Sequence, residues 1–292
     1  MTERRRLVRV PASSANLGPG YDVLAAALST HLELEVTETG EFGVDAGGTP
    51  VPEDRSNLCV RAFERLHPAE GLRFEIRSEI PVAAGLGSSA AAIVAGLMAA
   101  EHLYELALER EALLAHAVEL EGHPDNVAAA LYGGFVICSD EDGSPSAARL
   151  DPPEGVEAVV VVPEQAVPTE EARDAIPAEI PLADAVANVA AASQLVLGIQ
   201  RSDLTLIERG LADRIHQPRR AELYPRSMEL VEGARELGAI GATISGAGPS
   251  VLVWTFWQST GKVVEGLRER AEGWAEVRRV PFSPLGADVP EL

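Results

Sequence analysis

Residues 81–91 place two glycines and two serines between a strand pattern and a helix pattern. The run is Pro81, Val82, Ala83, Ala84, Gly85, Leu86, Gly87, Ser88, Ser89, Ala90 and Ala91. Glycine lacks a Cβ atom, so the backbone can turn tightly and approach a ligand closely. A serine can cap the helix that follows, and the first N–H groups of that helix attract an anion. The segment predicts a phosphate site that needs no lysine, although a simple capped strand-to-helix turn would use the same residues.

The composition limits how phosphate could be bound. The chain has 292 residues, with 24 Lys and Arg against 45 Asp and Glu, which gives a formal net charge of −21. Lys262 is the single lysine, and it follows neither the P-loop pattern nor the protein-kinase pattern. Phosphate binding must then use backbone N–H groups, a helix N-terminus, a metal ion or arginine. The acidic balance also argues against a nucleic acid partner, whose phosphates require a basic surface.

Two further loops are rich in glycine and small residues. Residues 11–22 include Asn16 and Asp22, which could contact a polar substrate or merely cap the local backbone. Residues 241–250 can form a tight turn that packs its backbone against a neighbouring loop or a substrate. The residues of interest in this second turn are Ser245, Gly246 and Gly248.

A fourth segment, residues 121–126, reads Glu-Gly-His-Pro-Asp-Asn around a sharp turn. The Glu121 carboxylate could ligate Mg²⁺, a hard cation that prefers oxygen. Asp125 could cap the helix that follows, and His123 is interpreted as a turn residue rather than a ligand.

Strand and helix patterns occur in both halves of the chain, so the predicted fold class is α+β. Strands are predicted at residues 7–11, 31–37, 72–80, 135–138, 156–162, 242–244, 251–256 and 275–281. Helices are predicted at residues 57–66, 88–106, 109–120, 124–131, 169–175, 182–199, 204–212, 228–237 and 263–274. Residues 13–20 are expected to form a loop. Residues 141–153, rich in Gly and Pro, are either a domain boundary or a long hairpin turn.

The chain has features expected of a cytoplasmic protein. Two cysteines, Cys59 and Cys138, do not imply a disulfide framework. The basic N-terminal residues lead into a strand pattern rather than into the apolar core of a signal peptide. No apolar stretch is expected to span a membrane, and the run 90–100 comes nearest.

Together, the four segments resemble the superfamily of small-molecule kinases that act on galactose, homoserine, mevalonate and phosphomevalonate. Residues 81–91 match the phosphate loop of that superfamily without a departure, and residues 246–250 match its third motif. Residues 11–22, and residues 121–126 with Gly133 and Gly134 downstream, have the form typical of its homoserine kinase branch. The similarity extends over most of the chain.

The resemblance implies a two-domain α+β fold. Residues 1–153 would form an ATP-binding domain like the second domain of ribosomal protein S5, and residues 154–292 a ferredoxin-like domain that completes the substrate site. The implied reaction phosphorylates the side-chain hydroxyl of L-homoserine with ATP and Mg²⁺, giving O-phospho-L-homoserine in threonine biosynthesis. Members of the family often dimerise, so a homodimer is a candidate assembly.

The resemblance also assigns roles to individual residues. It places the triphosphate on residues 85–90 and Mg²⁺ on Ser89 and Glu121, with Ser88 as the competitor of Ser89. It directs Asp22 to the ammonium group of the substrate. The remaining assignments are Asn16 and Asn126 at the hydroxyl end, Arg220 at the carboxylate, and Thr169 and Arg173 near the substrate. Arginine suits a carboxylate because it can pair bidentately, and we expect the cleft near Ser88 and Arg220 to be electropositive.

Three points stay open at this stage. Asn126 stands where several relatives use an Asp, so no strong catalytic base is expected, with Asp125 as the alternative base. At Ala191, three positions after Asn188, the chain lacks a basic residue that many members carry, and Arg219 is a candidate replacement. A sister kinase, such as one for mevalonate, would share the phosphate loop.

Overall fold

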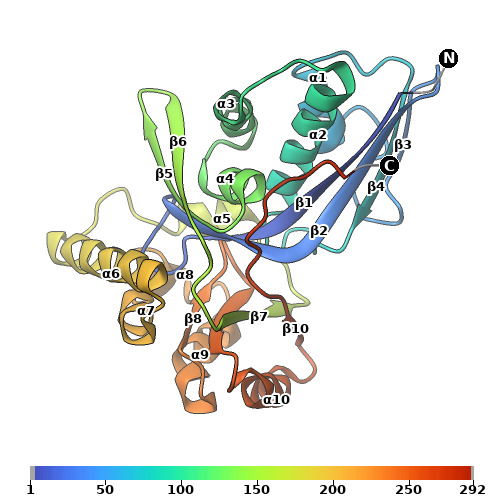
Figure 1. The fold of residues 1–292 in the computed structure, drawn as a ribbon. Coiled ribbons are helices and arrows are strands. Elements are labelled where there is room, and N and C mark those ends of the chain that lie inside the picture. The colour runs from blue at the N-terminus through green and yellow to red at the C-terminus, as the bar shows by residue number, and fades with distance from the viewer. Residues whose placement is uncertain (1–3, 291–292) are drawn as a thin grey trace.

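Two long paired strands organise the first half of the computed structural model, which describes residues 4–290 (Figure 1). These are β1 (Arg5–Ala15) and β2 (Leu24–Glu38), which run antiparallel. The sheet also contains β3 (Gly43–Asp45), β4 (Leu72–Ser78), β5 (Phe135–Glu141) and β6 (Ser144–Leu150). Its strand order is β3-β4-β2-β5-β6, with β1 paired to β2. In β2, buried leucines and a valine alternate with more exposed residues, so one face of the strand lies on the core.

Four helices cover one face of this sheet (Figure 1). They are α1 (Leu58–Glu64), α2 (Ser88–Tyr104), α3 (Arg110–Glu121) and α4 (Asp125–Tyr132). The central helix α2 is buried and rich in alanine, which compensates for the scarcity of aromatic residues by close packing. A Cβ atom on Gly96 of α2 would lie 2.2 Å from the carbonyl oxygen of Cys59 in α1. The contact between α1 and α2 therefore requires glycine at this position.

The second half forms a smaller antiparallel sheet with the order β10-β7-β9-β8. Its strands are β7 (Val156–Pro163), β8 (Gly241–Ile244), β9 (Val251–Phe256) and β10 (Ala275–Arg279). Helix α9 (Pro225–Gly233), the 3-10 turn η1 (Ala234–Leu237) and α10 (Thr260–Ala271) pack against it. Between β7 and α9 lie α5 (Thr169–Asp174), α6 (Leu182–Arg201), α7 (Leu204–Gly210) and α8 (Gln217–Arg220).

The C-terminal segment after β10 ties the two sheets together. It returns to the first sheet, where Asp288 pairs with Arg9 and Phe282 with Leu28. The rings of Phe135 from the first sheet, Trp254 from the second and Phe282 from this segment form a cluster with centroid distances of 4.7–5.6 Å. This shared apolar cluster fixes the position of one sheet relative to the other.

Several predicted elements differ from the observed ones. The predicted loop at 13–20 is wrong at its start, because β1 continues through Ser13 to Ala15 and pairs there with Ala25 to Ala27 of β2. The segment 141–153 contains strand β6, which forms a hairpin with β5. Gly143 lies in the hairpin turn, Pro145 is paired within β6, and Pro152 and Pro153 follow the strand. Cys59 and Cys138 are buried free thiols, and burial raises the pKa of each to about 12.

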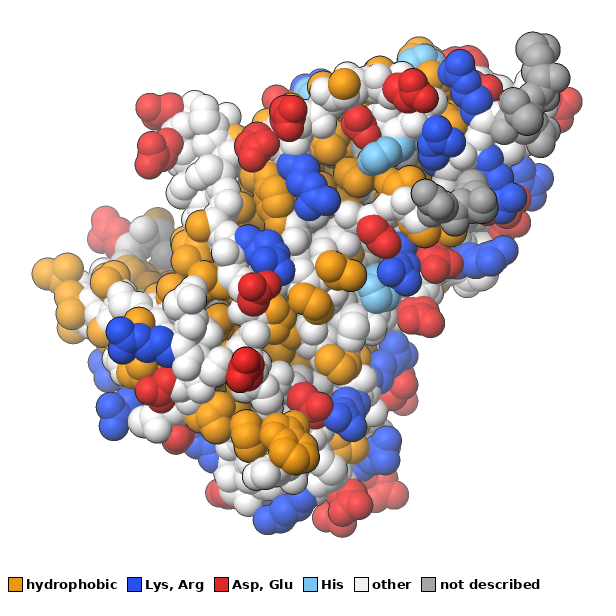
Figure 2. Space-filling view, viewed as in Figure 1, with side chains coloured by type: hydrophobic (Ala, Val, Ile, Leu, Met, Phe, Trp, Pro, Cys, Tyr) orange, Lys and Arg blue, Asp and Glu red, His pale blue; other side chains and the backbone are white. Residues whose placement is uncertain are grey.

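Helix α6 carries an exposed apolar surface. Among the described residues, α6 is the one helix long and apolar enough to cross a membrane, so the expectation that no stretch reaches this length is wrong. Its inner side packs on α7, where a Cβ atom on Gly198 would lie 2.7 Å from the amide nitrogen of Ile207. Its outer side exposes Leu182, Val186 and Val189, and Figure 2 shows hydrophobic side chains gathered there. The inner contact indicates a helix that belongs to the protein core on one side.

The close contact at Gly96 gives a test of the packing. We expect Gly96→Ala to lower the free energy of unfolding by about 1–3 kcal/mol, because the new methyl group must displace backbone. The matched control is Gly261→Ala in α10, where a Cβ atom would meet nothing within 4 Å; it should be neutral or stabilising by up to about 1 kcal/mol. Urea unfolding of both variants measures the difference, and equal stability would contradict the close contact.

Candidate active site

The phosphate loop is shaped by the segments that press on it. Ala83, Gly85 and Gly87 have positive φ angles of 55°, 77° and 69°, an alternation typical of concave backbone sites for anions. A Cβ atom on Gly85 would lie 2.4 Å from the carbonyl oxygen of Ser245. A Cβ atom on Gly87 would lie 2.0 Å from the Ser13 hydroxyl oxygen. Glycine is therefore required at both positions for packing as well as for the turn.

Helix α2 begins directly at this loop. Its N-cap is Gly87, which makes no side-chain capping bond, so the expectation that Ser88 or Ser89 caps the helix is wrong. Both serines are the first residues of the helix itself. The first N–H groups of α2 are left without a side-chain acceptor and face the loop, which favours an anion there.

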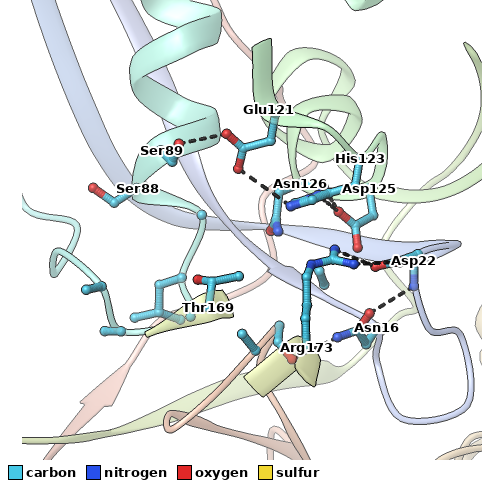
Figure 3. Close-up of a pocket in the computed structure, with 18 of the residues that line it drawn as sticks. Asn16, Asp22, Ser88, Ser89, Glu121, His123, Asp125, Asn126, Thr169 and Arg173 are labelled. Carbon is cyan, nitrogen blue, oxygen red and sulfur yellow. Dashed lines mark hydrogen bonds and ion pairs between the residues drawn. The ribbon is translucent and has the colours of Figure 1, made fainter. Parts of the chain in front are cut away.

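Ser89 and Glu121 meet beside the helix start. The Ser89 hydroxyl donates to a Glu121 carboxylate oxygen at 2.7 Å, whereas Ser88 points away (Figure 3). Glu121 is the last residue of α3, and Gly122 turns the chain back with a φ of 89°. One hydroxyl and one carboxylate fit a magnesium ion that takes its other ligands from phosphate and water. No group of three or more His, Cys, Asp or Glu side chains suited to a metal occurs in residues 4–290.

The turn after Glu121 brings three side chains into the site. His123 Nδ1 lies 2.9 Å from an Asp125 carboxylate oxygen, which also accepts the Asn126 backbone N–H at 2.6 Å. Burial lowers the pKa of His123, but the hydrogen bond to Asp125 and the charges of Asp125 and Glu121 outweigh burial and raise the pKa overall. His123 lines the cavity, so its interpretation as a mere turn residue missed it. Its place between two carboxylates, at alternate positions of a sharp turn, was the signal available in the sequence.

Asp22 and Arg173 form an ion pair across the two halves of the molecule. The guanidinium nitrogens lie 2.9 and 3.1 Å from the two carboxylate oxygens, and one of them also donates to the Tyr21 hydroxyl at 3.2 Å. Asp22 follows β1 and Arg173 lies on α5, so the pair joins the first domain to the second (Figure 3). Asp22, expected at the substrate ammonium group, and Arg173, expected near the substrate, thus neutralise each other in this structure.

Asn16 has partners for both ends of its amide. Its Oδ1 accepts the Asp22 backbone N–H at 3.0 Å, and its Nδ2 donates to the Gly246 carbonyl oxygen at 2.8 Å. Asn16 is buried and has a positive φ of 68°, which asparagine tolerates better than most residues. These contacts fix the shape of the loop at residues 16–22. A contact with a substrate hydroxyl would use the second N–H of Nδ2 or the second lone pair of Oδ1.

Arg220 is buried among backbone carbonyl groups. Its Nε donates to the Ala172 carbonyl oxygen at 2.6 Å, and Nη1 donates to Gly246 at 3.2 Å and lies 3.3 Å from His216 Nδ1. Burial lowers the pKa of His216, and the Arg220 charge lowers it further, against the opposing effect of Asp213. Arg220 lines the cavity, but its Nε and Nη1 atoms donate to carbonyl oxygens of α5 and of the turn at residues 241–250. Arg219, by contrast, pairs with Asp184 at 3.5 Å and does not line the cavity.

Most of the predicted site residues line one cavity of about 130 Å³ between the two halves. The predicted residues that do not line it are Pro81, Val82, Ala90, Ala91, Ser245 and Gly248. Its walls include Asn16, Asp22, residues 83–89, Glu121, Asp125, Asn126, Thr169, Arg173, Arg220 and Gly246. Asp22, Glu121 and Asp125 share this cavity with Arg173, Arg220 and His123. The expectation of an electropositive cleft therefore stays a prediction, which depends on the start of α2 as well as on side-chain charge. Figure 2 shows acidic and basic side chains interspersed over one face of the molecule.

A second cavity, of about 400 Å³, adjoins the phosphate loop on the side of α1. It shares Ala83, Ser88, Ser89 and Thr169 with the first cavity. Its other walls are largely apolar and include Leu32, Val51, Pro52, Leu58, Cys59 and Ile76. This cavity was not predicted from the sequence, in which only a helix at residues 57–66 is indicated for this region.

Comparison with known proteins agrees with this geometry. Residues 57–134 match the GHMP kinases N terminal domain, and residues 195–273 match the GHMP kinases C terminal domain. The chain therefore belongs to the GHMP kinase family. Within it, proteins named homoserine kinase are 35–42% identical to this chain over 83–97% of its length, so the chain belongs to the homoserine kinase family.

A homoserine kinase of Thermus thermophilus is 42% identical over 83% of this chain and 84% of its own length. That of Streptomyces avermitilis is also 42% identical, over 97% of this chain and 94% of its own. The crystal structure of a homoserine kinase from Cytophaga hutchinsonii superposes with a TM-score of 0.89, at 29% identity, over 99% of this chain and 98% of that one. These similarities confirm the predicted two-domain α+β kinase fold.

The contact between Ser89 and Glu121 distinguishes the two serines. We expect Ser89→Ala to lower kcat by about 10–100-fold, the range found when a partner of a metal ligand is lost. Ser88→Ala, the matched control, should change kcat by less than about threefold, because Ser88 points away from Glu121. Steady-state kinetics over a Mg²⁺ titration measures both, and a larger effect at Ser88 would reverse the assignment.

Proposed function

We propose that this chain transfers the γ-phosphoryl group of ATP to the side-chain hydroxyl of L-homoserine. The product, O-phospho-L-homoserine, belongs to threonine biosynthesis. The observation that carries the proposal is the Asp22–Arg173 pair in the same cavity as the phosphate loop. An amino acid carries one ammonium and one carboxylate, so it is complementary to such a pair in charge. The relatives named above act as the independent support.

ATP would lie across the two adjoining cavities. The triphosphate would rest on residues 85–90, over the N-terminus of α2, where backbone N–H groups and the helix dipole favour negative charge. The base and ribose would occupy the second cavity, whose apolar walls suit an aromatic ring. Phosphoryl transfer needs mainly such positioning and charge neutralisation.

Mg²⁺ would be held by the Glu121 carboxylate and the Ser89 hydroxyl. When bound, the ion supplies positive charge that stabilises the phosphoryl oxygens. Ser89 then orients the Glu121 carboxylate, and the start of α2 keeps both groups beside the phosphate loop. Both proposed ligands are oxygen atoms, which Mg²⁺ prefers.

L-homoserine would bind between the two halves of the molecule. Asp22 would take the ammonium group, and Arg173, with Arg220 behind it, would take the carboxylate. Asn126 lies on the opposite wall, at the start of α4, where the hydroxyl end of the substrate would reach the phosphate loop. Asn16 and Thr169 would line the remaining walls. The substrate would thus substitute its own charges for the mutual contact of Asp22 and Arg173.

No strong general base is proposed for the reaction. Asn126 cannot take a proton at neutral pH, and one Asp125 oxygen already accepts bonds from His123 and the Asn126 N–H. The hydroxyl oxygen would form its bond to the γ-phosphorus as ADP leaves, and the hydroxyl proton would pass to an oxygen of the transferred group.

We further propose a cytoplasmic location and no membrane attachment, since α6 packs its inner face on α7. A homodimer is the proposed assembly, by analogy with the family.

The substrate assignment is tested by measuring ADP release with L-homoserine, mevalonate and galactose in parallel. We expect turnover with homoserine well above the others, because mevalonate and galactose lack an ammonium group for Asp22. A homoserine signal at background would end the assignment.

The role of Asp22 is tested by substitution. Asp22→Asn should raise the KM for homoserine about 10–100-fold, since a hydrogen bond to a charged group contributes about 1.5–3 kcal/mol. The control is Glu157→Gln, which removes an exposed ion pair to Arg279 far from the cavity.

The absence of a base is tested by Asp125→Asn. We expect kcat to fall by less than about tenfold, because loss of a true general base typically costs 10²–10⁴-fold. Circular dichroism and thermal unfolding establish that the variant is folded. A loss of several orders of magnitude in a folded variant would make Asp125 the base.

A further inference from the structure

Ser13 connects the phosphate loop to the residue at the acceptor end of the cavity. It lies near the end of β1, is fully buried, and donates its hydroxyl to Asn126 Oδ1 at 2.8 Å. The Ser13 backbone N–H donates to the Leu86 carbonyl oxygen at 3.1 Å. Its hydroxyl fills the space that a Cβ atom on Gly87 would need. The sequence analysis assigned no role to Ser13.

The direction of the bond from Ser13 follows from burial. Within residues 4–290, the Ser13 hydroxyl has no hydrogen-bond partner other than the Asn126 amide. A buried O–H without an acceptor is costly, so the Ser13 proton must point at an oxygen atom. The Asn126 amide therefore turns its Oδ1 toward Ser13 and its Nδ2 away from it, toward the cavity.

We propose that Ser13 is a positioning residue, which makes Asn126 present its amino group rather than its carbonyl oxygen to the reacting atoms. This proposal rests on the function proposed above. An amino group can donate to the acceptor hydroxyl oxygen or to a phosphoryl oxygen. A carbonyl oxygen in the same place would instead face the phosphoryl oxygens as a second negative end of a dipole.

The neighbours of Asn126 favour the same orientation. The carboxylates of Glu121 and Asp125 lie on the same side of the cavity. An amide carbonyl beside these groups would add to their negative potential, whereas an N–H group is attracted by it. Ser13 and the surrounding charges therefore agree on which end of the amide enters the cavity.

Ser14, the next residue of β1, has a different set of contacts. Its hydroxyl lies 2.8 Å from that of Ser245, which donates to the Gly85 carbonyl oxygen at 2.6 Å. Successive strand residues point to opposite sides, so the two serines serve different neighbours. Ser14 belongs to the packing of the glycine turn against the phosphate loop, and Ser13 alone of the two reaches Asn126.

A double-mutant cycle tests whether Ser13 acts through Asn126. The variants are Ser13→Ala, Asn126→Ala and the double variant, with ATP and homoserine as substrates. We expect Ser13→Ala to lower kcat about 10–100-fold and to change the KM for ATP by less than about threefold. If Ser13 acts through Asn126, the double variant should be no slower than Asn126→Ala within about twofold. Multiplicative effects, or a Ser13→Ala kcat within twofold of wild type, would overturn the proposal.

Two controls keep the result interpretable. Ser283→Ala removes another buried serine hydroxyl, which donates to the Leu285 carbonyl oxygen away from the cavity, and should leave kcat unchanged. Neutron diffraction from wild-type crystals grown in deuterated solvent locates the amide deuterons of Asn126 directly. Deuterons that face the cavity support the proposal, and deuterons that face Ser13 refute it. This measurement decides the orientation even if the wild type fails to phosphorylate homoserine, a result that would refute the proposed function alone.

Discussion

The whole site depends on the close contact of three backbone segments around the phosphate loop. The Ser245 hydroxyl and carbonyl from the second domain and the Ser13 hydroxyl from β1 occupy the space beside Gly85 and Gly87. Because no side chain fits at either glycine, the loop is held from both sides without a bound ligand. The start of α2 thereby faces the cavity in a fixed direction, which a site based on backbone N–H groups requires. The Phe135, Trp254 and Phe282 rings hold the second sheet against the first. The position of Ser245 beside Gly85 therefore depends on this apolar contact between the sheets.

What could be predicted from the sequence is what local patterns encode. The alternation in β2 and the phosphate loop follow from residue types at short spacing. The pairing of Ser89 with Glu121, 32 residues apart, was implied by the family resemblance, and the structure places the two side chains in contact. Contacts between distant segments are not encoded in that way. Ser13 appeared to be a loop residue because serine is common in turns, and only its pairing with β2 makes it a strand residue. The position of His123 on the cavity wall likewise depends on the packing of α3 against α4, although its contact with Asp125 is local to the sharp turn.

Arg220 and Arg173 have different partners and therefore different structural roles in the cavity. Arg220 was expected to bind the substrate carboxylate, and Arg173 was expected to lie near the substrate. The structure leaves Arg173 at the cavity with a single carboxylate partner, whereas it surrounds Arg220 with the carbonyl oxygens of Ala172 and Gly246. Arg220 thus holds α5, which carries Arg173, against the glycine turn. A buried arginine with backbone partners positions a neighbouring arginine that stays free to exchange its partner for a ligand.

Three carboxylates line the cavity in which the triphosphate is proposed to bind, although carboxylates repel an anion. Each already has a partner: Asp22 has Arg173, Asp125 has His123 with its raised pKa, and Glu121 has Ser89. A carboxylate paired with a cationic group repels an incoming anion far less than a free one would, because the pair acts as a dipole rather than as a net charge. Glu121, whose partner Ser89 is a neutral hydroxyl, keeps its negative charge, which suits a cation. In the proposed function, the attraction for phosphate comes from the start of α2 and from the cation that Glu121 would hold. A protein with a formal charge of −21 and one lysine can therefore bind a polyanion, provided that the positive ends of its dipoles, rather than its side-chain charges, line the loop.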